Sequence, residues 1–339
     1  MEPGAKLMKK GAGFVFILIF LLVSCREKAE LPYNESRFLM DTVVRIGIYQ
    51  SDFPLDKIKA TVDGAFDTMA RLEGKLSSGI DTSEVSRLNQ TPQTVSKETW
   101  DCLADGIRLS KLCGGAFDIT IGEVKQLWDF SGDNPKVPDP AELREALAYV
   151  DYHQVLLDSP YVSLRFPENR IDLGGIVKGF IVDQAVMFLE KSGIKAGVVE
   201  AGGDLRFFGH HPQKDKWRVG VQNPRPKDKQ ITAIIALDSG AVATSGDYER
   251  FFMRDGKRYH HLLDPKTGYP ASECISVTIV TTNAMLADGL ATAVFVLGPI
   301  QGMTLVEKMD DVEVVIISES NGKMTEYVSR GLKGNIQFL

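Results

Sequence analysis

Cysteine is scarce in this 339-residue chain, which contains four. Cys25 lies near the amino end, whereas Cys102, Cys113 and Cys274 are far apart and flanked by apolar residues. The sequence has neither the paired spacing of a zinc site nor the dense cysteine framework of a small disulfide-stabilised fold. We therefore expect the three inner cysteines to be small buried side chains in an ordinary apolar core.

The chain also lacks an excess of positive charge. It carries 39 Lys and Arg against 45 Asp and Glu, a formal net charge of −6 at pH 7. Loss of residues 1–24, which hold three lysines and one glutamate, would change this charge to −8. Proteins that bind nucleic acid usually present a basic surface to the phosphates, so we expect no nucleic-acid partner.

A long membrane-spanning segment is missing from the amino end. The apolar run from Phe14 to Val23 is too short to cross a bilayer comfortably. It follows three lysines and precedes Ser24 and Cys25, which is the layout of a secretory signal. Leu22 to Cys25 also resembles a bacterial lipobox, in which the cysteine becomes the lipid-modified first residue. An ordinary signal followed by an accidental cysteine is the alternative.

These features predict a division of the chain into three parts. Residues 1–24 are a signal peptide with a lipobox, residues 25–37 are a linker after a lipidated Cys25, and residues 38–339 form one domain. We expect an exported lipoprotein that is anchored to the membrane and faces the periplasm or the extracellular side.

Hydrophobic periodicity predicts an α+β fold with mixed or antiparallel sheets and flanking helices. Alternating residues predict a first strand over 40–49, and apolar stripes predict helices over 54–74, 98–112 and 141–149. Paired short strands follow over 155–157 and 162–166, and the second half is mainly strands with a helix over 284–296. Hairpins outnumber crossover helices, which argues against a doubly wound parallel sheet.

The segment from Asp172 to Gly179 combines an acid, a glycine pair and a lysine where a strand is expected to meet a helix. Gly174 and Gly175 would let a phosphate approach unsatisfied backbone N–H groups, and Lys178 would add a positive charge in the first turn. The alternative is that the glycines only end a buried strand. Thr244 to Asp247 and Ala201 to Asp204 are interpreted as further turns that carry acids.

Asp288 and Thr292 are four residues apart on a predicted helix, so their side chains share one face. A carboxylate and a hydroxyl there can hold a hard cation such as Mg²⁺. Alternatively, Thr292 bonds back to the carbonyl of Asp288.

His260 and His261 lie on opposite sides of a short predicted strand, so only one of them can face a cleft. A histidine there can take a proton from a hydroxyl near neutral pH, although a satisfied core or surface histidine is the more usual case for any single histidine.

Taken in order, these segments resemble the ApbE family of flavin transferases. The matching segments cover nearly all of the expected mature chain: 40–42, 83–89, 114–120, 172–179, 201–204, 243–248, 261–268 and 287–292. The resemblance implies two lobes around a flavin-binding cleft. It also implies a Mg²⁺-dependent enzyme that cleaves FAD, attaches FMN to a Thr or Ser of a target protein and releases AMP. The implied targets are extracytoplasmic redox-protein subunits with a Thr or Ser acceptor motif.

The resemblance also assigns roles to residues of this chain. It places the metal site at Asp288, Thr292 and the backbone of Gly175, and the base that activates the acceptor hydroxyl at His261. FAD would contact Met40, Gly79, Ala116, Phe117, Asp118, Asp172, Lys178 and Leu262.

Gly79 departs from the family pattern, which often has an aromatic residue there to stack on the flavin. Loss of this stacking would cost on the order of 1 kcal/mol. It leaves open hydrolysis of FAD to FMN and AMP, and a non-catalytic FAD-binding lipoprotein is the contrasting class.

Overall fold

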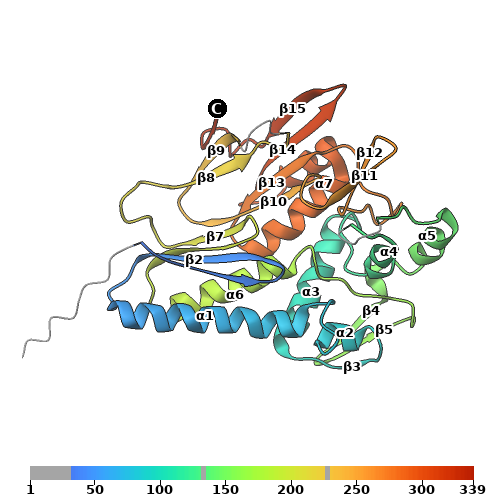
Figure 1. Cartoon of the computed structure of the whole chain (residues 1–339), viewed down its shortest axis with the longest axis horizontal. Coiled ribbons are helices and arrows are strands. Elements are labelled where there is room, and N and C mark those ends of the chain that lie inside the picture. Colours follow the sequence, from blue (N-terminus) through green and yellow to red (C-terminus); the bar gives the residue numbers. More distant parts are fainter. Residues whose placement is uncertain (1–31, 131–134, 226–229) are drawn as a thin grey trace, which may run out of the picture.

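An eight-stranded antiparallel sheet forms the centre of the protein in this computed structural model, which describes residues 32–130, 135–225 and 230–339 (Figure 1). Every neighbouring pair of its strands is antiparallel. In spatial order the strands are β1 (Tyr33–Leu39), β2 (Thr42–Gln50), β6 (Ala196–Ala201), β7 (Asp204–Phe208), β10 (Gly240–Gly246), β13 (Ser276–Thr281), β14 (Glu313–Ser320) and β15 (Lys323–Val328).

Three helices cover one face of this sheet. They are α1 (Leu55–Leu76), α6 (Val177–Lys191) and α7 (Ala284–Val306), with α6 in contact with α1, α7 and the sheet (Figure 1). The apolar stripe predicted for the first helix is confirmed, since Ile58, Val62, Phe66, Met69 and Leu72 are all buried. A stripe at this spacing buries one side of a helix against a sheet or another helix.

Helix α7 is apolar on every side because it is enclosed by the core. Among the described residues it is the one helix long and apolar enough to cross a membrane by composition, yet more than half of that window is buried inside the protein. It packs on β10, β13 and β14, and it kinks at Gly298, which has a φ of 76°. These contacts are those of a core helix.

A second sheet covers the opposite face. It contains β8 (Trp217–Gln222), β9 (Ile231–Leu237) and β16 (Ile336–Phe338). Trp217 and Ile235 pack there against Val198 and Phe207 of the central sheet. Because the middle of the central sheet is covered on both faces, β6 and β13 are buried along nearly their whole length.

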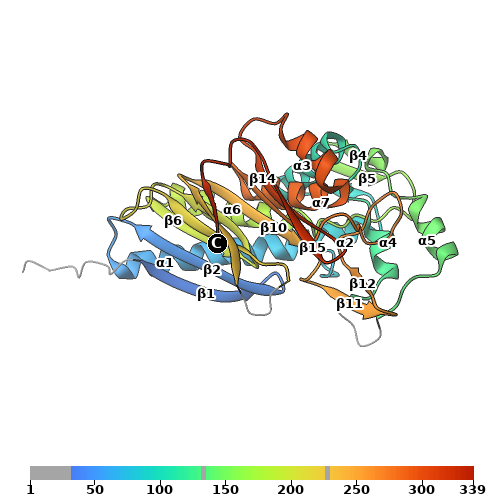
Figure 2. The ribbon, with the colours of Figure 1, turned by 90° about the horizontal axis from the view of Figure 1, so that it is seen from above.

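A smaller region lies beside the helical layer, at one end of the molecule in both views (Figures 1 and 2). Part of this region has a separate apolar core that contains Trp128, Leu143, Phe252 and Leu263, whereas Leu88, Leu103 and Val162 belong to the main core. Its elements are α2 (Glu84–Leu88), α3 (Lys97–Leu112), α4 (Gly122–Leu127), α5 (Pro140–Leu147), the 3-10 turn Tyr152–Gln154, and strands β3 (Gln93–Thr94), β4 (Val155–Asp158), β5 (Tyr161–Leu164), β11 (Phe251–Arg254) and β12 (Lys257–His260). The predicted α+β class is confirmed.

Three details of the prediction are wrong. Residues 33–37 were assigned to a linker but lie in β1, so the strand that was expected to be the first is β2. The prediction missed β1 because it is an edge strand whose residues are only half buried, which gives it a weak apolar signal. Thr244 to Gly246 lie in β10 and do not form a turn. The glycine segment at Asp172 follows only an isolated bridge between Ile121 and Arg170, not a strand. The expected signal peptide, Cys25 and residues 26–31 of the linker lie outside the described residues.

Candidate active site

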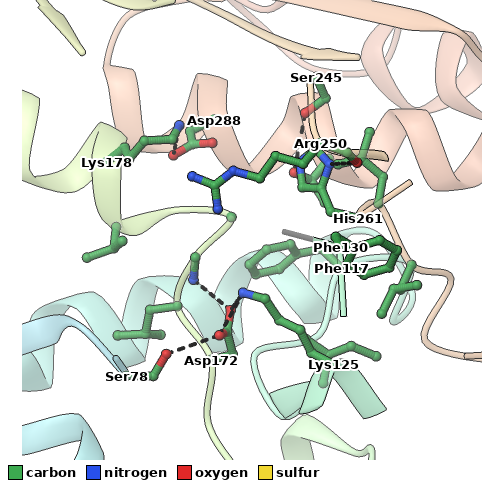
Figure 3. A pocket seen from close by; sticks show the side chains of 18 of the residues that line it. Ser78, Phe117, Lys125, Phe130, Asp172, Lys178, Ser245, Arg250, His261 and Asp288 are labelled. Atoms are coloured by element: carbon green, nitrogen blue, oxygen red, sulfur yellow. Dashed lines mark hydrogen bonds and ion pairs between the residues drawn. The ribbon is translucent and has the colours of Figure 1, made fainter. Parts of the chain in front are cut away.

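All of the predicted site residues line one cavity of about 510 Å³, which lies between α6, α7 and the central sheet on one side and the smaller region on the other (Figure 3). This volume is within the usual range of ligand pockets, about 300–1,000 Å³. The residues are Met40, Gly79, Ala116, Phe117, Asp118, Asp172, Gly175, Lys178, His261, Leu262, Asp288 and Thr292.

The predicted metal residues meet at one wall of the cavity. A Cβ atom on Gly175 would lie 3.4 Å from the Thr292 hydroxyl and 2.9 Å from the Phe117 ring, so a larger residue would displace one of them. The Thr292 hydroxyl lies 3.4 Å from that of Ser245 rather than bonding back to the carbonyl of Asp288. Within the described part of the chain, no three His, Cys, Asp or Glu side chains form a metal cluster. A cation here would therefore need hydroxyl and carbonyl oxygens as well as the Asp288 carboxylate, a donor set that suits Mg²⁺.

Lys178 lies between two acids at this wall. Its ammonium is ion-paired with Asp204 and lies 3.6 Å from Oδ2 of Asp288. This Asp288 oxygen also accepts a hydrogen bond from the N–H of Gly179 at 3.2 Å. Burial alone would lower the pKa of Lys178, but the two carboxylates raise it above its usual value, so the side chain stays charged. Burial and the neighbouring Asp288 raise the pKa of Asp204.

Asp172 is held at the opposite wall by contacts that the sequence did not indicate. The Lys125 ammonium lies 2.8 Å from both of its carboxylate oxygens, the N–H of Gly174 donates at 2.9 Å, and the Ser78 hydroxyl donates at 3.1 Å (Figure 3). Burial by itself would raise the pKa of Asp172, but Lys125 and these donors bring it below its usual value. Asp172 is therefore a fixed anion within the cavity wall.

The carboxylate of Asp118 stabilises the loop that forms part of the cavity wall. It accepts hydrogen bonds from the N–H and hydroxyl of Thr120, at 2.8 and 2.6 Å, and from the N–H of Tyr152 at 3.0 Å. These bonds occupy both carboxylate oxygens and hold the loop that places Ala116 and Phe117 at the cavity.

Met40 and Gly79 lie at the cavity in two different turns. Met40 and Asp41 both have positive φ values, 55° and 56°, in the two-residue turn between β1 and β2, and the N–H of Met40 donates to Glu73 at 2.9 Å. Residues with side chains rarely adopt this conformation, and it is usual in the mirror-image turns of hairpins. A Cβ on Gly79 would meet only the Ser77 hydroxyl, at 3.6 Å, so the position has room for a side chain.

His261 faces the cavity, whereas His260 does not. The ring of His260 is buried and its Nε2 lies 2.8 Å from the carbonyl of Ala271, which confirms that only one of the pair faces the cleft. The Nδ1 of His261 lies 3.3 Å from the carbonyl oxygen of Arg250. Burial, with His260 and Arg250 nearby, lowers the pKa of His261 to about 3, so the ring is neutral at pH 7. If Nδ1 carries the ring proton and donates a hydrogen bond to this carbonyl, Nε2 is unprotonated and can accept a proton from a substrate hydroxyl.

Several cavity residues escaped the sequence analysis. Arg250 extends its guanidinium across the cavity, and Lys125 and Phe130 lie on the far wall (Figure 3). Glu249 also lines the cavity, where burial raises its pKa to about 7. Glu249 and Arg250 directly follow the motif that ends at Tyr248, so a longer window on that motif could have found them.

Comparison with known proteins agrees with this arrangement. The model of the ApbE family matches residues 40–316. A FAD:protein FMN transferase of Haemophilus influenzae is 35% identical over 268 residues, which cover 75% of this chain and 78% of the relative. The FAD:protein FMN transferase of Treponema pallidum is 32% identical over 315 residues, 87% of each chain.

Solved structures show the same fold. The ApbE protein of Thermotoga maritima has a TM-score of 0.82 and 35% identity, covering 89% of this chain and 98% of its own. The flavin transferase ApbE of Vibrio cholerae has a TM-score of 0.80 and 31% identity, with the same coverage. The chain is a member of the ApbE family.

Proposed function

We propose that this protein is an FAD:protein FMN transferase. It would cleave the diphosphate of FAD, attach FMN through a phosphoester to a threonine or serine of a target protein, and release AMP. One observation carries the proposal: a neutral histidine, a charged lysine and a set of oxygen donors share one cavity in a chain of this family.

We propose Asp288, Thr292 and the backbone carbonyl of Gly175 as the residues that would hold Mg²⁺. Their oxygen donors and their common position at one wall support this assignment. When bound, the ion would neutralise charge on the diphosphate, which is the main electrostatic demand of phosphoryl transfer.

His261 is the proposed general base. The acceptor oxygen forms a bond to the FMN phosphorus, the bond from that phosphorus to the bridging oxygen breaks, and AMP leaves with that oxygen. The hydroxyl proton passes to Nε2 of His261, while the carbonyl of Arg250 orients the ring through Nδ1. The ring is neutral at pH 7, so its unprotonated nitrogen is available to accept the proton.

The remaining residues would bind FAD. Lys178 is charged and lies beside the proposed metal residues, which suits contact with the diphosphate. Met40, Gly79, Ala116, Phe117, Asp118, Asp172 and Leu262 would surround the flavin and adenosine parts, with Asp118 contributing through its backbone, since its carboxylate is already bonded.

Gly79 favours a second outcome at the same site. Without an aromatic ring there, water could replace the protein hydroxyl and give FMN and AMP. A non-catalytic FAD-binding lipoprotein is less consistent with the cavity, because simple binding does not require a neutral histidine beside the proposed metal residues.

We also propose that the protein acts outside the cytoplasm. The lipobox-like segment ending at Cys25 supports lipid anchoring, and redox subunits exposed on the same side would be the targets. Incorporation of labelled fatty acid into the wild-type chain, and its loss in Cys25→Ser, would test the anchor.

The activity itself is tested with the chain without residues 1–24, FAD, Mg²⁺ and a redox subunit that carries a threonine acceptor segment. A fluorescent protein band on a denaturing gel, with AMP in solution, is the expected result. Free FMN plus AMP would indicate the hydrolase, and unchanged FAD would contradict both activities.

A further inference from the structure

We infer that the free edge of strand β11 is the docking site for the flavin-accepting protein, which adds an extended acidic segment there as a third strand. The inference rests on the proposed transferase activity and specifies how the macromolecular substrate reaches His261. Strands β11 and β12 form a separate two-stranded sheet, and β12 leads directly into His261.

The register of this hairpin shows which backbone groups are unpaired. Arg254 pairs with Lys257 around a two-residue turn, and the N–H of His261 donates to the carbonyl of Arg250 at 3.1 Å. Hydrogen-bonded and non-bonded pairs alternate in antiparallel strands, so the N–H and C=O groups of Phe251 and Met253 point away from β12. Within the described residues these groups have no hydrogen-bond partner.

The side chains at this edge are apolar and exposed. Met253 is 56% exposed and Phe251 37% exposed, on the face opposite Phe252, which is buried in the core of the smaller region. Such an edge is a template for strand addition unless something covers it or blocks it.

The edge also leads to the active site. Phe251 and Arg250 line an open hollow of about 470 Å³ together with Asp41, Phe130 and Glu249. Arg250 and Glu249 line the active-site cavity as well, so the hollow adjoins that cavity. Neighbouring strands lie about 4.8 Å apart, so an added strand on β11 would be about 10 Å from the strand of His261. About three extended residues cover that distance, which places the acceptor hydroxyl roughly three residues beyond the paired segment.

Charge selects an acidic occupant. The chain as a whole has a net charge of −6, but the hairpin from Phe251 to His260 carries Arg254, Lys257 and Arg258 against a single acid, Asp255, and of these three cations Arg258 is already paired with Asp247. Arg254 and Lys257 are exposed and have no ion-pair partner among the described residues. A partner segment with acidic residues would meet this local positive charge.

Proline substitution tests strand addition directly. Met253→Pro removes an outward N–H without removing a hydrogen bond of the hairpin, because proline is tolerated on edge strands where that group faces solvent. Met324→Pro is the matched control, because β15 is also an edge strand. Met324 pairs with Glu319, one position from the two-residue turn of its hairpin, as Met253 does in β11. The N–H of Met324 therefore also points away from the neighbouring strand. A second variant, Met253→Glu, covers the case in which the proline disturbs folding.

Binding is measured with a redox subunit whose acceptor threonine is replaced by valine, so that docking is independent of the reaction. We expect Met253→Pro and Met253→Glu to weaken this binding about tenfold or more, the order expected when several edge contacts are lost, with Met324→Pro within about twofold of wild type. Neutralising the acidic residues of the subunit should weaken binding to wild type. FAD affinity should be unchanged in all three variants.

The results separate docking from chemistry. Equal binding by wild type and both Met253 variants would overturn the docking site, even if FMN transfer is observed. Binding that depends on Met253 would uphold the docking site, and failure of wild type to transfer FMN to the threonine form of the subunit would then contradict only the proposed function.

Discussion

Lys125 and Asp172 form a forked contact, in which the lysine ammonium lies 2.8 Å from both carboxylate oxygens. The pair joins α4 to the glycine segment that carries Gly175 and leads into Lys178. The side chain of Asp172 is 12% exposed and that of Lys125 is 42% exposed. Water can therefore solvate the charge of Lys125, whereas the charge of Asp172 is compensated mainly by the lysine.

Removal of the lysine should therefore leave a poorly compensated anion. We expect Lys125→Met to raise the pKa of Asp172, weaken FAD binding about tenfold and lower the free energy of unfolding by about 1–2 kcal/mol, less than for a fully buried pair because Lys125 is partly exposed. Titration of FAD fluorescence and denaturant melts would measure both effects. Lys125→Arg should restore most of the affinity, and an unchanged affinity in Lys125→Met would show that the pair does not position the FAD site.

Asp288→Asn tests the metal assignment with little change of shape. The amide oxygen is neutral and therefore a much weaker ligand for Mg²⁺ than a carboxylate, so we expect turnover to fall by about 100-fold or more, equivalent to about 3 kcal/mol. Added Mg²⁺ should not restore the rate, and the melting temperature should change little. Magnesium titrations of wild type, Asp288→Asn and the exposed control Asp310→Asn would decide this, and a wild-type response in Asp288→Asn would exclude the assignment.

The state of His261 can be tested by pH. The protein lowers the pKa of His261 to about 3, whereas an unfolded histidine titrates near 6.5. Above about pH 6.5 the ring is neutral in both states and its titration adds nothing to stability. Below that pH only the unfolded chain gains the proton, so stability is lost as the pH falls toward 3.

Wild type should therefore lose stability relative to His261→Gln between about pH 7 and pH 5, by on the order of 1 kcal/mol, allowing for partial exposure of the ring. Denaturant melts at both pH values would measure this difference, with His210→Gln as the control for an exposed histidine. Parallel pH profiles for wild type and His261→Gln would mean that the ring is not held neutral. His261→Gln should also stop transfer more severely than it weakens FAD binding.

Gly79→Tyr should restore the stacking partner that this chain lacks. A Cβ at this position meets only the Ser77 hydroxyl, at 3.6 Å, so the backbone can accept the substitution. We expect FAD affinity to increase about fivefold, equivalent to about 1 kcal/mol from ring stacking, with slower release of flavin products. Gly79→Ala controls for the change in backbone freedom. If the alanine and tyrosine variants bind FAD equally, the ring does not reach the flavin.

Local pattern was sufficient to predict α1, α3, α5, α6, the first part of α7 and most strands, but not the short helices α2 and α4. The spacing of Ile58, Val62 and Phe66 specifies a helix face wherever that helix packs, and the four-residue spacing of Asp288 and Thr292 brings their side chains to one side. The ordered motifs carried the family resemblance, and the tertiary structure brought all of the predicted site residues to one cavity.

Other features depended on contacts between distant segments. Lys125 and Asp172 are 47 residues apart, and no local pattern connects them. The carboxylate of Asp118 is held by the backbone N–H of Tyr152, and the ring of His261 is oriented by the carbonyl of Arg250. The edge strand β1 has a weak apolar signal because only half of it is covered. Sequence alone determined most of the elements and the chemical groups of the site, since these follow from spacing along the chain. Only the tertiary structure decided their partners, their charge states and the open edge beside the cavity, because those depend on burial and on side chains contributed by remote parts of the chain.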